Sequence, residues 1–369
     1  MIKTMKQGWE IKKLGEVCNI NYGTRVVQKK DGGTIYPVYG GGGATFKMDR
    51  YNREDCLIVS RFAMSNQCVR YVSGKFFLND SGLTIESNES ELSQSFLDRH
   101  ITALNDTIYS LGKGVAQKNL DVKELRLLDI KYPKSREEQE RIVEELDCLS
   151  SVIEKKREQL RELDALAQSI FYTMFGDPNN CIYETRNLSD LSEHKLSYGS
   201  GASAVDFDGK IRYVRITDIK DDGELQGDKV SPNVFDDKYT LNDGDILFAR
   251  SGATVGKTYQ YRQKDGKAIY AGYLIRFIPN RNIVLPSYIF GYTKTNYYKA
   301  FISASAQVVA QPNINAQQYG ALKVPIPPLT LQQEFADKIE AIEKQKALIK
   351  QSITQTEELF NARMDYYFN

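Results

Sequence analysis

The sequence predicts an α+β protein in which two mixed α/β lobes alternate with two long α-helices that pack as an antiparallel coiled coil with pseudo-twofold repeat symmetry. Three observations predict this fold: the two halves of the 369-residue chain match, short β-type runs fill most of each half, and a long apolar pattern of three–four spacing ends each half. The expected segments are a first lobe at 1–134, a central helix at 135–176, a second lobe at 177–328 and a C-terminal helix at 329–369.

The repeat is clearest where each lobe ends. Residues 116–120 (AQKNL) match residues 310–314 (AQPNI) at an offset of 194 residues, and the same offset places Tyr172 on Tyr366. It also places Gln139-Glu140 on Gln333-Glu334. The two halves are therefore expected to end in the same way.

The beginnings of the halves match at smaller offsets. Tyr22-Gly23 matches Tyr198-Gly199 at an offset of 176 residues, and Arg61 matches Arg250 at an offset of 189. The offset grows along the chain, which indicates insertions in the second copy. Each half then consists of a lobe of roughly 130 to 150 residues followed by a helix of about 40.

Within the lobes, β-type runs at residues 56–59, 246–249 and 273–277 are bounded by Gly, Asn and Asp. This pattern is typical of short strands between turns. The proline at 133 and those at 325–328 mark the places where the chain leaves each lobe and a helix begins.

The long helices are predicted from apolar residues at three–four spacing, which form a coiled-coil seam. Lys156 interrupts the first seam and Lys346 interrupts the second at about the same place. Forty residues span about 60 Å as a helix, and the simplest closed arrangement packs the two helices antiparallel with one lobe at either end. A helix pair that only dimerises the chain is the alternative. The seam positions are Ile142, Leu146, Leu149, Ile153, Leu160, Leu163, Ala167 and Ile170, and Phe335, Ile339, Ile342, Ile349, Ile353, Thr356 and Phe360.

Composition excludes several classes of protein. No apolar run approaches the ~20 residues of a membrane span, and the N-terminal residues lack the apolar core of a signal peptide, so we expect a cytoplasmic protein without a membrane partner. The five cysteines form no CxxC pair, and the two histidines have no second histidine at metal-ligand spacing. Disulfide frameworks and histidine-based metal sites are therefore not expected.

Two glycine-rich segments resemble nucleotide-binding motifs but do not meet their requirements. Residues 251–258 (SGATVGKT) have three residues between their glycines, whereas a phosphate-binding loop needs four. Residues 40–43 (GGGG) lack the strand, helix and acidic residue of a dinucleotide site, so a flexible turn or a close backbone approach is expected there. No cofactor is predicted for this chain.

Charge is distributed unevenly along a chain whose net charge is only +1. Residues 9–134 and 183–328 each carry 18 basic and 15 acidic residues, while the helix segments are acidic. Residues 250–300 carry nine basic residues against the single acid Asp265, and tyrosines lie among them. Basic lobes with interleaved tyrosines favour contact with nucleic acid, although most of these tyrosines are expected to belong to the core.

Four local motifs carry a family resemblance. Residues 36–40 (YPVYG) followed by further glycines, and residues 243–257 (DGDILFARSGATVGK), resemble target-recognition segments. Residues 324–329 (VPIPPL) and 171–177 (FYTMFGD) resemble the lead into one helix and the end of another. Together with the repeat, which spans essentially the whole chain, they resemble the specificity (S) subunit of type I restriction-modification systems. Residues 132–136 depart from the Pro-Pro-Leu form, which leaves the start of the first helix open.

The resemblance implies a non-catalytic protein in which each lobe reads one half of a bipartite double-stranded DNA target. The paired helices would set the spacing and carry two modification (methyltransferase) subunits. S-adenosylmethionine, ATP and magnesium would belong to these and to restriction/translocase subunits, not to this chain. A free-standing DNA nuclease or methyltransferase, and a coiled-coil scaffold without DNA function, are the alternatives.

Candidate DNA-contacting residues lie beside the matched turns and segments. Arginine offers guanine a bidentate donor pair, and glutamine can do the same for adenine. Arg250→Ala is expected to weaken binding by a sequence-specific amount of about 1 to 3 kcal/mol, whereas a uniform loss on all DNA would mark a phosphate contact. The candidates are Arg25, Tyr39, Arg61, Lys113, Gln117, Arg215, Arg250, Ser251, Lys257, Tyr273 and Gln311.

Overall fold

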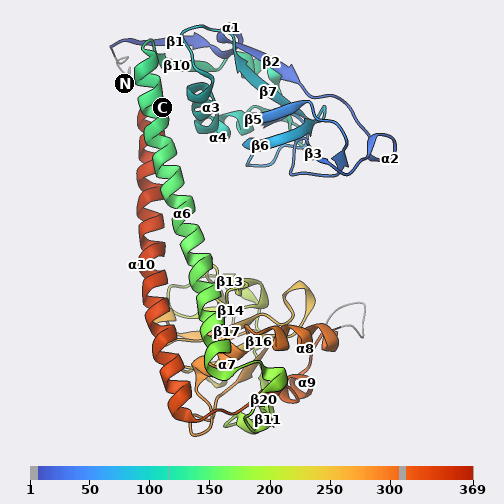
Figure 1. Cartoon of the computed structure of the whole chain (residues 1–369), viewed down its shortest axis with the longest axis vertical. Helices are drawn as coiled ribbons and strands as arrows, with labels where there is room; N and C mark the ends of the chain where they lie inside the picture. Colours follow the sequence, from blue (N-terminus) through green and yellow to red (C-terminus); the bar gives the residue numbers. More distant parts are fainter. Residues whose placement is uncertain (1–6, 116, 307–312, 369) are drawn as a thin grey trace. The chain divides into compact units, whose positions relative to one another are not determined.

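The computed structural model describes residues 7–115, 117–306 and 313–368, and the chain divides into two compact units. Unit 1 comprises residues 1–155 and 352–369, and unit 2 comprises residues 156–351. The long helices α6 (Arg136–Phe175) and α10 (Leu329–Phe368) each contribute a segment to both units. Each unit is therefore one mixed α/β lobe together with segments of both helices (Figure 1). No helix in the described part of the chain has the length and apolarity needed to span a membrane.

The lobe of unit 1 is built on a six-stranded sheet of order β2-β7-β5-β6-β3-β4. Antiparallel pairing of β1 with β10 brings the two ends of the lobe together beside the start of α6. The strands are β1 (Trp9–Lys13), β2 (Cys18–Tyr22), β3 (Tyr36–Tyr39), β4 (Lys47–Met48), β5 (Arg53–Ser60), β6 (Val69–Leu78), β7 (Gly82–Ser87), β8 (Gly112–Lys113), β9 (Asn119–Leu120) and β10 (Asp129–Pro133). The helices are α1 (Leu14–Val17), α2 (Gln28–Asp31), α3 (Gln94–Ala103), α4 (Asn105–Ser110) and α5 (Val122–Arg126).

The core of unit 1 includes the end of α10. Phe368 is buried, and its ring centroid lies 4.9 Å from that of His100 and 5.3 Å from that of Phe96, both on α3. Ile142 and Leu146 of α6 belong to the same apolar cluster. Glu145 of α6 accepts a hydrogen bond from the Tyr367 hydroxyl at 2.7 Å. The last turns of α10 thus complete the core of the first lobe.

The lobe of unit 2 contains a four-stranded sheet of order β12-β19-β16-β17 and several two-stranded pairs. Its strands are β11 (Thr185–Asn187), β12 (Ser197–Tyr198), β13 (Ala204–Asp206), β14 (Arg212–Val214), β15 (Val230–Pro232), β16 (Ile246–Ala249), β17 (Thr258–Gln260), β18 (Ala268–Tyr270), β19 (Leu274–Phe277) and β20 (Lys323–Pro325). Its α-helices are α7 (Pro286–Tyr292), α8 (Asn296–Ala306) and α9 (Ala316–Gly320). Short 3-10 helices are η1 (Pro178–Asn180), η2 (Leu188–Leu191), η3 (Ile216–Asp218), η4 (Asp237–Tyr239), η5 (Gly252–Thr254) and η6 (Gln263–Asp265).

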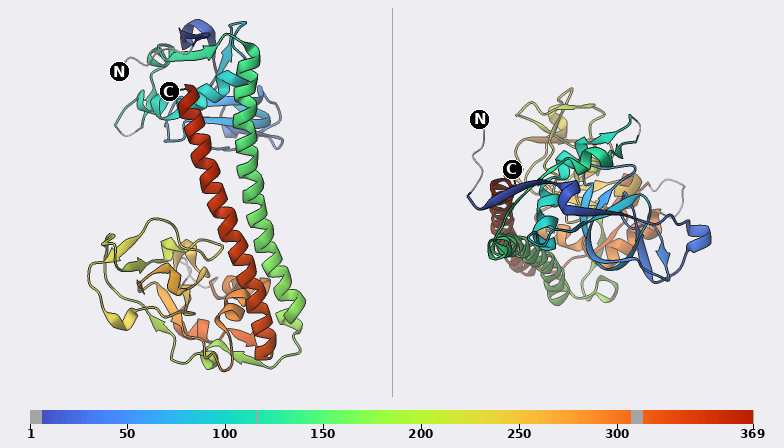
Figure 2. Two further views of the ribbon diagram at one scale, coloured as in Figure 1. Left: turned by 90° about the vertical axis from the view of Figure 1, so that its left-hand side faces the viewer. Right: turned by 90° about the horizontal axis from the view of Figure 1, so that it is seen from above.

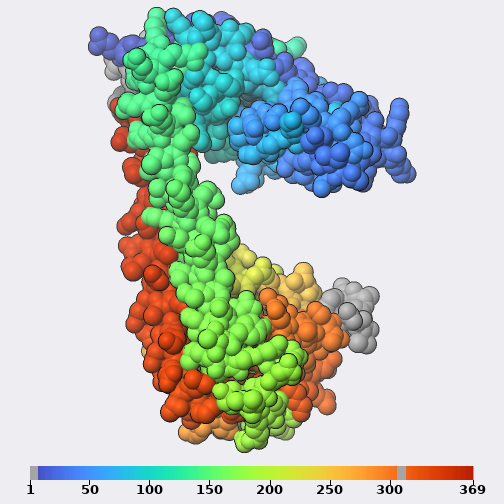
Figure 3. Space-filling model, in the orientation of Figure 1, coloured from blue at the N-terminus to red at the C-terminus, as the bar shows by residue number. Residues whose placement is uncertain are grey.

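The core of unit 2 includes the end of α6. Phe171 and Phe175 are buried against Tyr288 of α7 and Phe335 of α10, with ring centroids 4.8 to 5.6 Å apart. Gly176 follows with a φ of +77°, the left-handed conformation that commonly ends a helix. Within each unit the segments of α6 and α10 lie side by side, as Figures 1 and 2 show and as the adjoining green and red surfaces in Figure 3 illustrate.

A buried glutamine joins each lobe to the helix that follows it. The Gln139 amide nitrogen donates to the carbonyls of Pro133 and Glu91, and its oxygen accepts from the Ser93 N–H. The side chain of Gln332 makes the same three kinds of contact in unit 2. Its partners there are the carbonyls of Pro327 and Ile283 and the N–H of Leu285.

These contacts correct the sequence alignment of the two helices. Gln139 corresponds to Gln332, not to Gln333, which is exposed and donates a hydrogen bond to Asp337 on its own helix. Because α6 and α10 are both 40 residues long, their starts at 136 and 329 give an offset of 193 over the whole helix. Lys346 then corresponds to the buried Ile153 and not to Lys156. Two consecutive glutamines in the second copy leave the alignment of the helices ambiguous in the sequence. The alignment is resolved because Gln332 is buried and Gln333 is exposed.

We expect Gln332→Ala to lower the free energy of unfolding by about 2 to 4 kcal/mol, because it leaves three buried backbone groups without a partner. Gln333→Ala is the matched control and should cost less than about 0.5 kcal/mol, since that side chain is exposed. Urea denaturation of the two variants measures the difference. Equal losses would contradict the assigned role of Gln332.

Candidate nucleic-acid interface

In the lobe of unit 1, Arg61 lies directly after β5 with its guanidinium over two aromatic rings. The guanidinium carbon is 4.9 Å from the centroid of Tyr22 and 4.5 Å from that of Phe62. Tyr22 is 45% exposed, so the stack is at the surface. No described residue forms a hydrogen bond or ion pair with this guanidinium. Arg61 is thus a positioned cation whose N–H donors are available to a ligand.

In the lobe of unit 2, Arg250 lies directly after β16 in the same arrangement. Its guanidinium carbon is 4.8 Å from the centroid of Tyr198, a ring that is 41% exposed. Its Nε donates to the Asn313 side-chain oxygen at 3.2 Å. The terminal Nη groups form no hydrogen bond or ion pair with a described residue. Each lobe therefore holds an arginine stacked on an exposed tyrosine. We call Arg61 with Tyr22, and Arg250 with Tyr198, the two arginine–tyrosine pairs.

The backbone around the two pairs is also equivalent. The Arg61 N–H donates to the Ser81 carbonyl at 2.8 Å, and the Arg250 N–H donates to the Tyr273 carbonyl at 3.1 Å. The Arg61 carbonyl accepts from Leu120, and the Arg250 carbonyl accepts from Ile314, both at 2.8 Å. These contacts confirm the matches of Arg61 with Arg250 and of Leu120 with Ile314 drawn from the sequence.

The glycine after each tyrosine is required by a close backbone crossing. A Cβ at Gly23 would lie 1.9 Å from the Asn79 carbonyl oxygen, and one at Gly199 would lie 2.3 Å from that of Tyr270. Gly23 donates to the Gly82 carbonyl, and Gly199 to that of Leu274. Because no side chain fits at these crossings, the Tyr-Gly repeat in the sequence reflects a backbone constraint.

The residue two positions after each arginine has a left-handed backbone. Gly252 has a φ of +69° and Ala63 has a φ of +48°. An alanine in this region is disfavoured by roughly 1 to 3 kcal/mol, so the surrounding contacts hold the turn of unit 1 in place. The Ala63 N–H donates to the Asn119 side chain, and the Met64 N–H donates to the Lys118 carbonyl.

The β8–β9 hairpin and the glycine run surround the pair in unit 1. Gln117 and Val115 are exposed in the hairpin loop, and the Lys118 amine lies 4.1 Å from the centroid of Tyr109. The Arg70 guanidinium donates to the carbonyls of Gly41 and Gly42. A Cβ at Gly41 would lie 2.2 Å from the Phe62 carbonyl oxygen, which confirms the close backbone approach expected for the glycine run.

Of the other residues selected from the sequence, some lie near the pairs and others have internal partners. Tyr273 is exposed next to Arg250, and Ser251 forms a backbone bridge with Asn313. Arg25 is exposed three residues after Tyr22. Gln311 lies outside the described residues. Tyr39 packs edge-on against Phe76 at 5.5 Å, and Lys113 forms an ion pair with Asp121 at 2.6 Å.

Arg215 is held by a carboxylate of its own lobe. Its guanidinium donates to Asp218 at 2.7 Å, and this hydrogen bond raises the pKa of Arg215 above its ordinary value. Arg215 would have to leave Asp218 to contact DNA through the same donors.

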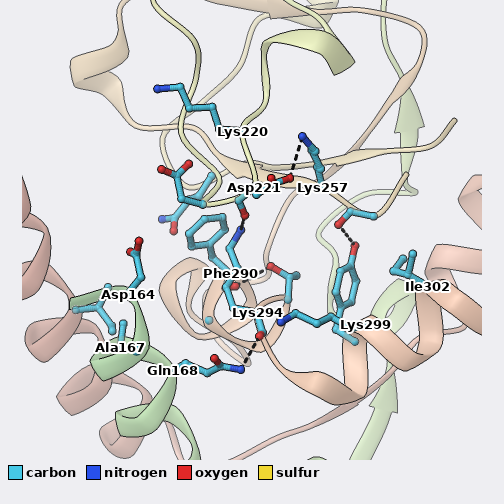
Figure 4. A pocket seen from close by; sticks show the side chains of 18 of the residues that line it. Asp164, Ala167, Gln168, Lys220, Asp221, Lys257, Phe290, Lys294, Lys299 and Ile302 are labelled. Carbon is cyan, nitrogen blue, oxygen red and sulfur yellow. Dashed lines mark hydrogen bonds and ion pairs between the residues drawn. The ribbon is translucent and has the colours of Figure 1, made fainter. Parts of the chain in front are cut away.

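Lys257 points into a cavity of unit 2 that sequence reasoning did not identify (Figure 4). The cavity has a volume of about 1360 Å³ and is lined by α6, α10 and the second lobe. The Lys257 amine pairs with Asp221 at 2.9 Å. At the helix side, the buried Lys346 amine lies 2.7 Å from Asp164 and 3.0 Å from Glu343. Although Lys257 follows Arg250 closely in sequence, its amine is engaged in this cavity.

Lys294 lies in the same cavity over the ring of Phe290, with its amine 4.6 Å from the centroid. The amine donates to the Asp221 carbonyl at 3.3 Å. Burial lowers the pKa of Lys294 to about 8, against the opposing effect of Asp222 and Asp164. Spacing in the sequence carries no signal for this shift, because it arises from burial by distant elements.

We expect the stability of the protein to rise between about pH 8 and pH 10 because of Lys294. The unfolded lysine has a pKa of about 10.4, so the unfolded state binds more protons than the folded state in this window, and the free energy of unfolding increases with pH by about 2 to 3 kcal/mol. Lys294→Met should remove this rise, whereas Lys299→Met, an exposed control lining the same cavity, should keep it. Urea denaturation at several pH values gives the slopes, and parallel slopes for Lys294→Met and the wild type would rule out this assignment.

No group of three or more metal-ligating side chains occurs in the described part of the chain. The candidate site therefore consists of the arginine–tyrosine pairs and the residues around them.

Comparisons with known proteins match this architecture. A putative specificity subunit of the type I restriction enzyme MjaX from Methanocaldococcus jannaschii is 30% identical over 167 residues, which is 42% of this chain and 38% of that protein. The match thus spans well under half of that relative's length.

Two solved structures align over the whole chain. The S subunit of a type I restriction-modification system from M. genitalium aligns with a TM-score of 0.61 at 16% identity, covering 100% of this chain and 98% of that one. A structure described as showing complex assembly and conformational transition of the type I R-M system aligns with a TM-score of 0.56 at 14% identity, covering 99% of each chain. At these identities the likeness establishes the fold.

The family model for the type I restriction modification DNA specificity domain matches residues 6–164 and again residues 182–358. The two matches confirm the internal repeat and the resemblance drawn from the sequence. The chain belongs to the type I restriction modification DNA specificity domain family.

Proposed function

We propose that this chain is the non-catalytic DNA-recognition subunit of a type I restriction-modification complex, each lobe reading one half of a bipartite target. The observation that carries the proposal is the stacking of Arg61 and Arg250 on equivalent surface tyrosines. The two arginines lie in two lobes that match the same family model. Two similar cationic surfaces on one chain can each bind the phosphate backbone of the same DNA duplex.

The surroundings of the two pairs supply further proposed contacts. Exposed Gln117 offers an amide to a base edge, and exposed Arg25 follows Tyr22 by three residues. Exposed Tyr273 accepts a hydrogen bond from the Arg250 N–H through its carbonyl. Contacts with DNA are also proposed for Tyr39, Lys113, Arg215, Ser251 and Lys257, and for Gln311, which lies outside the described residues.

We further propose that α6 and α10 pair antiparallel as a coiled coil and act as a spacer between the lobes. Interactions between the two helices inside each unit support this: Glu145 pairs with Arg363 at 2.7 Å in unit 1, and Asp164 pairs with Lys346 in unit 2. A rigid spacer would place the half-sites about one helical turn apart on one face of the duplex. Spacing would then contribute to specificity, because a shifted half-site could not meet its lobe.

The partners follow from this role. Two modification subunits would dock on the helices and bind S-adenosylmethionine, and restriction/translocase subunits would supply ATP- and magnesium-dependent chemistry. This chain would hold no cofactor of its own and would act in the cytoplasm, where the DNA is. The solved complex-assembly structure of a type I R-M system, which shares the fold, supports such partners.

We expect the chain, expressed with its modification subunit in a methylation-free host, to produce adenine methylation at a single bipartite motif. Long-read sequencing of the host DNA measures the motif. Replacing the lobe at 177–328 with that of another specificity subunit should alter one half of the motif only. Methylation or cleavage by the purified chain alone would favour a free-standing enzyme, and no methylation despite a stable complex would favour a scaffold.

We expect a fragment of residues 1–182 to form a symmetric dimer through its helix. Its lobe lacks Met364 and Phe368, which complete the core of unit 1, and at an offset of 193 residues Phe171 and Phe175 of a second copy can take their places. Light scattering after size-exclusion chromatography gives the mass. A folded, strictly monomeric fragment would exclude interchangeable halves.

A further inference from the structure

The two lobes share one local structure and differ around it. Tyr39 and Val214 occupy the same place, since Tyr39 pairs with Leu78 and Val214 with Tyr270 in parallel registers, and their carbonyls accept from Asn79 and Ala271 respectively. The residues that follow them differ completely: unit 1 continues with the glycine run from Gly40, whereas unit 2 continues with Arg215.

The residue after each stacked arginine differs as well. The Arg61 guanidinium carbon lies 4.5 Å from the centroid of the Phe62 ring, while Ser251 follows Arg250 and offers no ring. The hydrogen bonds that hold the arginine backbone, the tyrosine beneath it and the left-handed turn after it are nevertheless the same in both lobes. The arginine–tyrosine pair is therefore the same in both lobes. The residues around it differ, and we call them the variable rim: the glycine run from Gly40 and Phe62 in unit 1, and Arg215 and Ser251 in unit 2.

The two stacked guanidiniums have no carboxylate partner among the described residues, unlike Arg215 and Arg276 of unit 2. Arg215 is paired with Asp218, and Arg276 is paired with the buried Asp245 at 2.5 Å. Stacking on tyrosine fixes the plane of a guanidinium without neutralising its charge. A fixed, charged fork of donors suits a phosphate group, which accepts two parallel hydrogen bonds.

We propose that Arg61 and Arg250 are equivalent phosphate anchors that bind the DNA backbone at the same place in each half-site, and that base reading belongs to the variable rim. This role replaces the base-reading role expected for Arg250 from the sequence alone. The inference rests on the proposed DNA-recognition function. Two lobes on one duplex meet the same phosphate backbone but, in general, different bases. The arginine–tyrosine pair, which is duplicated in both lobes, therefore suits the phosphate backbone that both half-sites share. Phosphate contacts set register and orientation, and base contacts give specificity.

The test uses the full chain in complex with its modification subunits. Binding is measured to two duplexes, the methylated motif and a version with both half-sites scrambled, over a series of salt concentrations. Arg250→Ala and Arg61→Ala are each expected to weaken binding to both duplexes by the same factor, about tenfold at fixed salt, and to lower the slope of log affinity against log salt by about 0.9. The methylated motif should stay the same.

The conservative variant separates a phosphate anchor from a base reader. Arg250→Lys keeps the charge but loses the planar fork, so a phosphate contact should retain the full salt slope and bind within about threefold of the wild type. Arg186→Ala is the matched charge control, since it removes the same charge from an arginine already paired with Glu184, and it should leave the salt slope unchanged.

The role of the ring is tested at Tyr22, whose hydroxyl has no partner among the described residues. Tyr22→Phe keeps the stacking surface and should bind like the wild type, whereas Tyr22→Leu should weaken binding to both duplexes about threefold with an unchanged motif. Equal binding by the two variants would overturn the positioning role of the tyrosine. Thermal unfolding of each variant confirms that the fold is retained.

A loss confined to the methylated motif, or a motif that becomes degenerate at one position, would make the arginine a base reader and overturn the inference. Unchanged binding by the Arg→Ala variants would overturn it as well. These results are distinct from a failure of the proposed function, in which the wild-type complex itself would not distinguish the two duplexes and would produce no methylated motif.

Discussion

The structure depends on one packing feature: the end of a long helix completes the core of each lobe. Phe368, the last described residue of α10, is buried on α3 in unit 1, and Phe171 and Phe175 at the end of α6 are buried against α7 in unit 2. Burying an aromatic side chain of this kind stabilises a fold by roughly 1.5 to 3 kcal/mol. The core of each lobe is therefore incomplete without side chains from the long helices.

The buried glutamines fix where each helix leaves its lobe. The side chains of Gln139 and Gln332 are buried, and each satisfies three backbone groups at the junction. The direction in which a helix leaves a lobe determines which of its faces meets the core. This local polar constraint thereby supports the apolar packing further along the helix.

The basic groups of unit 2 separate into two classes with different physical roles. Lys257 and Arg215 are engaged by Asp221 and Asp218, and Lys346 is engaged by Asp164 and Glu343, so their charges are compensated within the unit. Burial lowers the lysine pKa at Lys346, but the hydrogen bond to Asp164 and the charge of Glu343 outweigh it, so the pKa is raised and the amine stays charged. Arg250 instead contacts the Tyr198 ring and the Asn313 side-chain amide, which are both neutral, so its charge is available to an external anion.

The sequence by itself determined the repeat, the two long helices and the matched positions of Tyr22 with Tyr198 and Arg61 with Arg250, because repeated backbone constraints leave repeated residues at Gly23 and Gly199. It also selected the family correctly, from motifs spread over the whole chain. Tertiary structure alone decided how the two helices align, since Gln332 is buried and Gln333 is exposed. It alone also decided which cations are compensated: Asp218, Asp221 and Asp164 become partners through folding, and charge along a sequence does not reveal which carboxylate will lie within hydrogen-bonding distance of which amine or guanidinium.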